Sequence, residues 1–234
     1  MKIPAYMDLL GQAIYDHYFK LKGGKLWIHN KYGAKEEMPV NTYFRDPAKM
    51  PEMELLALQI CKGKVLDIGA AAGSHALALQ AKSTHVTALD ISAKACEVMK
   101  LRGVERVVQE DIFAFKGKRF DTLLLLMNGI GVTGNIQTLK LFLQQAKKLV
   151  NANGQLLFDS SDVAYLYDGI IPEMTHYYGE IHYRYEYKKQ KTDWFSWLYI
   201  DKVTLAKTAA GEGWKTEILL EDEFDQFLAK LTIA

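Results

Sequence analysis

Residues 65–75 read VLDIGAAAGSH, and this stretch decides the fold. A short apolar strand carries the carboxylate of Asp67 near its end, and a run of small residues then leads into a helix beginning at Ser74. Small residues let a ligand approach the backbone closely, and the start of the helix offers free N–H groups. The carboxylate repels a phosphate and suits a cationic ligand, so this turn differs from a diphosphate-binding loop. The alternative is a tight turn that binds nothing.

Strands and helices alternate around this turn, with short connections between them. Such alternation is typical of a doubly wound α/β fold, in which helices cover both faces of a mostly parallel sheet. The pattern predicts strands at 65–68, 85–89, 106–109, 120–127 and 155–159, and helices at 74–82, 93–102 and 136–150.

The flanking regions differ from this core. Helical spacing predicts helices at 3–19 and 51–61, and residues 181–187 and 194–200 are expected to form an inserted β-hairpin. Asp201 could cap a helix that runs to Ala210. Residues 214–220 and 224–231 read as closing strands, although the second could be a helix. We expect one domain with an N-terminal helical cap (1–60), a cofactor-binding core (61–159), an inserted lid or hairpin (160–200) and closing elements (201–234).

Composition excludes several classes of protein. The 234 residues are 49% hydrophobic, and 29 basic against 28 acidic residues give a net charge of +1. This balance argues against nucleic acid or an anionic membrane as the main partner, because both need clustered Lys and Arg. The sequence shows no secretory signal and no apolar run long enough to cross a bilayer. With two cysteines, expected to be reduced, the chain is predicted to be cytoplasmic.

Further polar residues follow the other predicted strands. Asp90 lies 23 positions after Asp67, where an acid accepts hydrogen bonds from ribose hydroxyls; it, or Ser92, could instead cap the next helix. Asp111 could bind an adenine amine. Asn128 follows the most apolar strand, where ligands sit in open α/β sheets, but it could simply form the turn before Gly129.

In their order, these motifs resemble those of class I S-adenosylmethionine-dependent methyltransferases over about residues 60–160. The resemblance implies S-adenosyl-L-methionine as cofactor and a seven-stranded Rossmann-like sheet whose last strand is antiparallel. It also implies a cofactor site. The methionine part would be held by Asp67, Gly69, Ala70, Ala71, Gly73 and the backbone of Met127, and the adenosine part by Asp90, Ile91, Asp111 and Ile112.

Two departures from the family pattern stand out. Ala71 replaces a residue that is usually glycine. The Asn/Asp-Pro-Pro-aromatic signature of members that methylate nucleic acids or glutamine is absent after residue 127. The expected acceptor is therefore a small molecule, methylated by in-line displacement at the sulfonium methyl. An RNA or protein acceptor would need a basic or extended groove, and the sequence does not indicate one.

No sequence motif identifies the catalytic residues. Candidates for a general base or a site residue are Asp159, Asn128 and His176, with Asp162, His29 and Tyr43 behind them. No spaced cluster of His, Cys or Asp suggests a metal. The aromatic insertion 160–200 could form a lid over a planar or cationic substrate, or it could pack as ordinary strands at a homodimer surface.

Two other functions stay open at this point. The first is a non-catalytic protein that binds S-adenosylmethionine, because a fold does not prove activity. The second is a nicotinamide-dependent oxidoreductase, which the carboxylate of Asp67 and the missing G-x-G-x-x-G spacing oppose.

Overall fold

The structure is a computed structural model that describes residues 8–167, 170–171 and 173–234. Its described residues fall into two compact units, and each is built from three separate stretches of chain. The first unit comprises Met1–Met50, Leu66–Phe115 and His182–Phe195; the second comprises Pro51–Val65, Lys116–Ile181 and Ser196–Ala234. Within the described ranges, no helix is both long and apolar enough to cross a bilayer.

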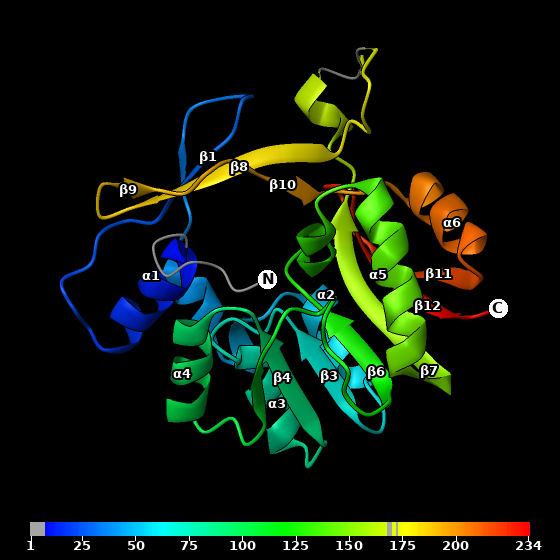
Figure 1. The fold of residues 1–234 in the computed structure, drawn as a ribbon, viewed down its shortest axis with the longest axis horizontal. Helices are drawn as coiled ribbons and strands as arrows, with labels where there is room; N and C mark the ends of the chain where they lie inside the picture. Colours follow the sequence, from blue (N-terminus) through cyan, green and yellow to red (C-terminus); the bar gives the residue numbers. More distant parts are fainter. Residues whose placement is uncertain (1–7, 168–169, 172) are drawn as a thin grey trace. The chain divides into compact units, whose positions relative to one another are not determined.

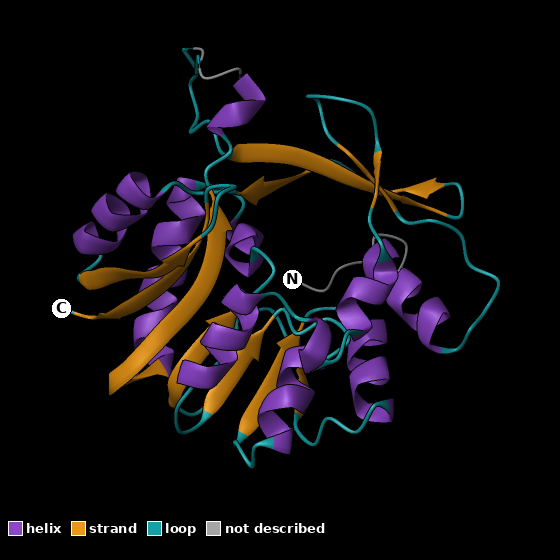
Figure 2. Cartoon of the chain, turned by 180° about the vertical axis from the view of Figure 1, so that it is seen from behind, coloured by secondary structure: helices purple, strands orange, loops and turns teal. Residues whose placement is uncertain are grey.

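The larger sheet has seven strands, which are drawn in orange in Figure 2 like the other strands. Its order is β11-β12-β7-β6-β3-β4-β5. Neighbours β4 and β5 are parallel, as are β6 and β7, whereas β12 is antiparallel to both β7 and β11. The predicted Rossmann-like sheet with an antiparallel last strand is therefore confirmed. The bounds are β3 (Val65–Ile68), β4 (Val86–Asp90), β5 (Val107–Gln109), β6 (Phe120–Leu125), β7 (Val150–Ser161), β11 (Trp214–Glu221) and β12 (Gln226–Ile233).

Two helices of the first unit begin at side-chain caps, and a third begins at Gly73 without one. These helices are α1 (Leu9–Tyr18), α3 (Ser74–Ala81) and α4 (Ala93–Leu101) (Figure 1). Asp8 accepts a hydrogen bond from Gly11 N at the start of α1, and Ser92 accepts one from Ala95 N at the start of α4. Ile14 of α1 packs in one buried cluster with Ala72 and Val98, so α1 covers the loop that follows β3. The predicted helix at 3–19 is confirmed from residue 9, and residues 3–7 lie outside the described residues.

The second unit contains α2 (Glu52–Ile60), α5 (Ile136–Leu149) and α6 (Lys202–Gly211). Asp201 caps α6 as predicted, accepting hydrogen bonds from Val203 N and Thr204 N. The predicted helix at 136–150 is α5, and the predicted strand at 155–159 is longer than expected, because β7 starts at Val150, directly after α5. Phe120 of β6 pairs with Val150 and Thr122 pairs with Gln155. The register therefore shifts between these pairs, which accommodates residues 151–154 in β7. Residues 226–233 form a strand, not the alternative helix.

A smaller sheet contains β1 (Trp27–His29), β2 (Glu36–Glu37), β8 (Glu180–Tyr187), β9 (Gln190–Lys191) and β10 (Phe195–Leu198). Strands β1 and β2 were not predicted from the sequence. Within the first unit, Ile28 of β1 lies opposite Tyr185 of β8. The predicted hairpin is tighter than expected, because β8 turns into β9 through Lys188 and Lys189, both with positive φ. Two such residues are what a two-residue hairpin turn requires.

Candidate functional site

The loop after β3 folds back against the end of β4. Gly69 N and Ala70 N both donate hydrogen bonds to Leu89 O, at 2.8 and 3.1 Å, and Gly73 N donates to Ala70 O at 2.7 Å. Three residues of the loop are left-handed: Gly69 (φ 73°), Ala71 (φ 49°) and Gly73 (φ 81°). An added Cβ at Gly69 would meet no atom within 4 Å, so the backbone there is open to a ligand.

Gly73 and Ala71 show why this loop favours glycine. A Cβ at Gly73 would lie 2.9 Å from carbons of Met99 and Val104, so glycine permits close packing of the helix start. Ala71 adopts a left-handed conformation that is unfavourable for a residue with a Cβ. This conformation gives a physical reason for the glycine that the family usually carries at position 71.

Asp67 is a buried acid next to this loop, and only 2% of the residue is exposed to solvent. Burial raises its pKa to about 6; the charge of Asp90 raises it further, whereas His75 and a hydrogen bond from the Ala76 backbone oppose the shift. No donor among the described residues lies within hydrogen-bonding distance of Asp67 Oδ2. A buried carboxylate oxygen that lacks a donor fits a ligand that brings a cation or an N–H group.

Asp90 ends β4 and holds the same loop. Its Oδ2 accepts a hydrogen bond from Ala71 N and its Oδ1 accepts one from Ser92 N, both at 2.8 Å. Burial raises the pKa of Asp90 to about 6, and the charge of Asp8 adds to the shift. Ser92, not Asp90, caps α4. Since the backbone of Ile91 also donates to Asp90, the carboxylate has three donors for its four lone-pair sites and keeps capacity for a further one.

Asp111 follows β5, the neighbour of β4. Gln109 lies opposite Asp90 in this parallel pair, and Glu110 N donates to Asp90 O at 3.1 Å. The Asp111 side chain accepts a hydrogen bond from Phe113 N at 2.9 Å, and Ile112 is buried. The first unit thus brings the predicted acids to the carboxyl ends of three consecutive strands, β3, β4 and β5.

The candidates of the second unit gather where β6 and β7 end. Met127 and Asn128 are both left-handed, with φ of 61° and 53°. Asp159 Oδ2 accepts a hydrogen bond from Asn128 N at 2.8 Å, and Asn128 Nδ2 donates to Leu198 O at 3.3 Å. Two residues predicted separately, Asn128 and Asp159, are therefore in direct contact. Gly131 follows in the same turn, and a Cβ there would overlap the indole of Trp197.

The remaining candidates have structural contacts. His176 is exposed, with Nδ1 3.1 Å from Tyr177 O. Asp162 accepts a hydrogen bond from Tyr178 OH at 2.7 Å. In the first unit, His29 lies 2.7 Å from Glu186, and Tyr43 OH donates to the sulfur of Met38. In the described part of the chain, no three His, Cys, Asp or Glu side chains gather in a way that could hold a metal ion.

Sequence reasoning missed a residue that contacts the loop. Arg102, at the end of α4, donates from Nη1 to Ala72 O at 2.5 Å and to Ser74 Oγ at 3.2 Å. Its guanidinium carbon lies 4.9 Å from the centre of the Phe44 ring. No local sequence signal could have identified Arg102, because its partners lie about 30 positions earlier in the chain.

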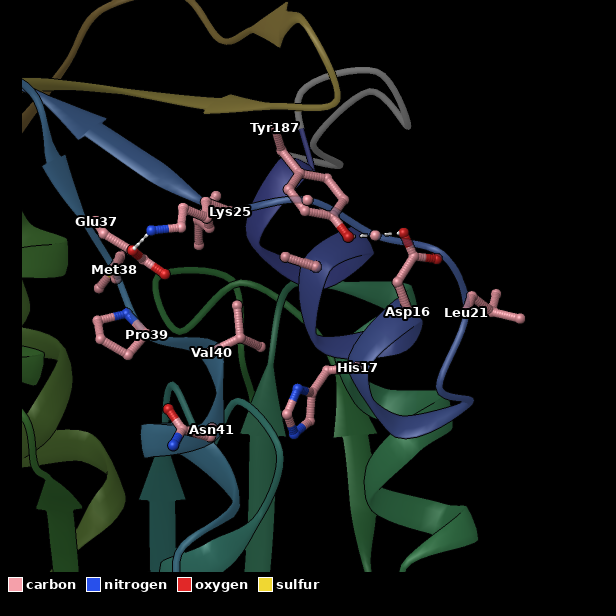
Figure 3. A pocket seen from close by; sticks show the side chains of 14 residues that line it. Asp16, His17, Leu21, Lys25, Glu37, Met38, Pro39, Val40, Asn41 and Tyr187 are labelled. Carbon is pink, nitrogen blue, oxygen red and sulfur yellow. Dashed lines mark hydrogen bonds and ion pairs between the residues drawn. The ribbon is translucent and has the colours of Figure 1, made fainter.

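A cavity of about 540 Å³ lies beside α1 within the first unit (Figure 3). Figure 3 shows two interactions at its edge: Tyr187 OH donates to Asp16 Oδ2 at 2.9 Å, and Lys25 pairs with Glu37 at 2.5 Å. Lys188 reaches the same Asp16 oxygen at 2.6 Å. Burial would raise the pKa of Asp16, but hydrogen bonds from Lys188, Tyr187 and Gln12 outweigh it and lower the pKa.

The chain is similar to known proteins in sequence and in fold. The model of a methyltransferase domain matches residues 43–209. A SAM-dependent methyltransferase from Bacteroides fragilis, solved with S-adenosyl-L-homocysteine, is 42% identical with a TM-score of 0.93, over 100% of this chain and 98% of that one.

More distant structures share the fold. The CcbJ methyltransferase from Streptomyces caelestis is 12% identical (TM-score 0.63; 83% of this chain, 95% of that one). The sugar N-methyltransferase KedS8 from a Streptoalloteichus species is 14% identical (TM-score 0.58; 86% and 96%). None of the curated proteins matches the sequence. With more than half of its length matched by the domain model and a relative 42% identical along its whole length, the chain belongs to the S-adenosylmethionine-dependent methyltransferase family.

Proposed function

We propose that this protein transfers a methyl group from S-adenosyl-L-methionine to a small-molecule acceptor. Asp67 carries the proposal: its carboxylate is buried, its pKa is raised, and its Oδ2 has no donor among the described residues. An acid of this kind, beside an open glycine-containing loop, suits the amino group of a bound amino acid. When bound, the cofactor supplies a sulfonium methyl with a good leaving group, so the protein's main task is positioning.

The residues predicted from the sequence would divide the cofactor between them. Asp67 and the loop of Gly69, Ala70, Ala71 and Gly73 would hold the methionine part, together with the backbone of Met127. Asp90 would accept hydrogen bonds from the ribose, and Ile91 would pack against the adenine. Asp111 and Ile112 would bind the adenine edge. Supporting this division, Asp90 keeps acceptor capacity beside the loop, and Asp111 follows the neighbouring strand.

A small-molecule acceptor is supported by two observations. The charge of +1 offers little attraction for a nucleic acid. The sugar N-methyltransferase KedS8 and the glycopeptide N-methyltransferase MtfA share the fold, and the same acceptor class is proposed here by analogy.

For the acceptor end of the reaction we propose Asp159 and Asn128. Asp159 holds the left-handed turn through Asn128 N, and Asn128 Oδ1 is a buried oxygen with no donor among the described residues. Such oxygens suit the N–H or O–H group of an acceptor, which a nearby carboxylate could deprotonate. His176 has less support, because it is exposed and lies against the Tyr177 carbonyl.

We further propose that the segments 1–60, 61–159, 160–200 and 201–234 act as one methyltransferase domain in the cytoplasm, where free cysteines such as Cys61 and Cys96 are usual. The exposed Trp194 of the insertion supports either an acceptor lid or a homodimer surface. Sedimentation velocity, with and without Trp194→Ala, separates the two, since only a dimer surface makes the mass depend on this residue.

The first test is calorimetric titration with S-adenosylmethionine and, separately, with NADH. We expect micromolar binding of S-adenosylmethionine, its loss in Asp90→Ala and no loss in Asp193→Ala, a matched change at an exposed aspartate. Binding of NADH alone would contradict the proposal. Candidate acceptors are then screened by formation of S-adenosylhomocysteine. Cofactor binding without turnover of any acceptor class would favour the non-catalytic alternative.

A further inference from the structure

Arg102 contacts the loop after β3 from the side of α4. Its Nη1 donates to Ala72 O at 2.5 Å and to Ser74 Oγ at 3.2 Å. The Ser74 hydroxyl in turn donates to Tyr43 O at 2.8 Å. One half-buried guanidinium, stacked over the ring of Phe44, therefore links the loop to α4 and to residues 43–44.

The carbonyl that Arg102 binds belongs to a residue whose two neighbours both have positive φ. Ala72 is fully buried and stands between two left-handed residues, Ala71 at φ 49° and Gly73 at φ 81°. Alanine resists this conformation because its Cβ approaches the backbone. The turn persists only if surrounding groups hold it. Asp90 holds it on one side through Ala71 N, and Arg102 holds it on the other through Ala72 O.

We propose that Arg102 is a positioning residue for the cofactor: its charge-assisted hydrogen bond to Ala72 O stabilises the left-handed Ala71–Gly73 turn and so sets the affinity for S-adenosylmethionine. This inference rests on the proposed function, because it assumes that this loop holds the methionine part. Arg102 acts through the loop, by preorganising a backbone that would otherwise lose affinity in ordering itself.

Position 71 makes the proposal testable by a double-mutant cycle. Glycine adopts positive φ readily, so in Ala71→Gly the loop should depend less on Arg102. Arg102→Met is expected to weaken binding of S-adenosylmethionine about tenfold, as loss of a hydrogen bond to a charged group predicts. In the Ala71→Gly background the same change should cost less than about threefold. Arg102→Lys keeps the positive charge but loses the planar guanidinium, so it should weaken binding by between about threefold and tenfold.

The experiment combines calorimetry with amide hydrogen exchange. Arg106→Met is the matched control, because Arg106 is exposed and lies just beyond the same helix. Exchange measured without ligand should quicken at Ala71–Gly73 in Arg102→Met while distant strands such as β12 stay unchanged. A role in overall stability alone would instead raise exchange everywhere. If Arg102→Met does not fold, Arg102→Lys and its pairing with Ala71→Gly carry the same test.

The outcomes are distinct. Equal affinity in wild type and Arg102→Met, or equal losses in both backgrounds, would overturn the role of Arg102 while leaving the proposed function intact. A wild-type protein that does not bind S-adenosylmethionine would overturn both.

Discussion

Two aspartates of the first unit are equally buried, yet burial affects them differently. Asp16 and Asp67 are each 2% exposed. Burial acts on both, but hydrogen bonds from Lys188, Tyr187 and Gln12 lower the pKa of Asp16 below its ordinary value. Burial raises the pKa of Asp67 to about 6, and one of its oxygens has no donor among the described residues. The chain supplies donors to the first carboxylate and leaves the second short of them.

This difference separates an acid that builds the fold from an acid that serves a ligand. A buried charge is tolerated when the chain pairs it, and it destabilises the fold when the chain does not. Asp67 is therefore expected to cost stability in exchange for affinity, whereas Asp16 is expected to contribute stability and little affinity. The four predictions below examine this contrast.

The largest expected effect is on affinity. Asp67→Asn should weaken binding of S-adenosylmethionine about 100-fold, or about 2.7 kcal/mol, because the amide cannot replace a buried anion facing a cationic ligand. Asp16→Asn should change affinity less than about threefold. Calorimetry on both variants makes the comparison, and similar losses in the two would abolish the distinction.

The next effect is on stability at Asp16. Asp16→Asn should lower the free energy of unfolding by about 2 kcal/mol at pH 7.5, because it removes the charge that faces Lys188 and turns an amide N–H₂ toward donors. Urea denaturation followed by circular dichroism measures this loss. Asp193→Asn, at an exposed position, serves as the control and should change little. A loss no larger than that of the control would show that the Asp16 cluster is not stabilising.

Substitution of Asp67 should raise the free energy of unfolding instead of lowering it, and the size of this change should depend on pH. The pKa of Asp67 is about 6 in the folded state and about 3.8 in the unfolded state, so ionisation weakens the fold as the pH rises between these values. Asp67→Asn should therefore be more stable than wild type by about 1 to 2 kcal/mol above pH 6, and the gain should shrink toward pH 4.

For Asp16 the folded pKa lies below the unfolded one, so its contribution is present above about pH 4 and is lost only at lower pH. The cost of Asp16→Asn should accordingly stay constant from pH 5 to 7.5. Denaturation curves across this range separate the two aspartates. A pH-independent gain in Asp67→Asn would contradict the raised pKa.

The smallest effect concerns one donor of the Asp16 cluster. Tyr187→Phe removes the hydroxyl that bonds Asp16 Oδ2 and should cost about 1 kcal/mol, with Lys188 still in place. Its effect in the Asp16→Asn background should be smaller, since the acceptor charge is already gone. Additive losses would mean that the Tyr187 hydroxyl stabilises the fold independently of the Asp16 charge.

Much of the fold could be predicted from the sequence because its signals are local. Strand ends, small residues and acids at Asp67, Asp90 and Asp111 follow one another with a spacing that a parallel sheet imposes. The helix caps at Ser92 and Asp201 are equally local. Asp159 and Asn128 could be placed at strand ends, but their contact depends on a turn geometry that no pattern encodes.

Other features depend on partners that are distant in sequence. Strands β1 and β2 are two or three residues long and acquire their conformation by pairing, with Ile28 opposite Tyr185. Arg102 belongs to a helix end whose sequence gives no hint of Ala72. Two of the three donors that lower the pKa of Asp16, Tyr187 and Lys188, lie about 170 residues away, beyond any sequence window around Asp16.

The separation of 171 residues between Asp16 and Tyr187 also orders events on the ribosome. The helix that carries Asp16 emerges long before the donor Tyr187 and the stretch His182–Phe195. Until then α1 cannot acquire its full set of contacts, although β3, β4 and β5 have already been translated. The nascent chain therefore completes its first unit only after the stretch His182–Phe195 has been translated, and a premature stop before residue 187 leaves an incomplete unit for proteases to remove.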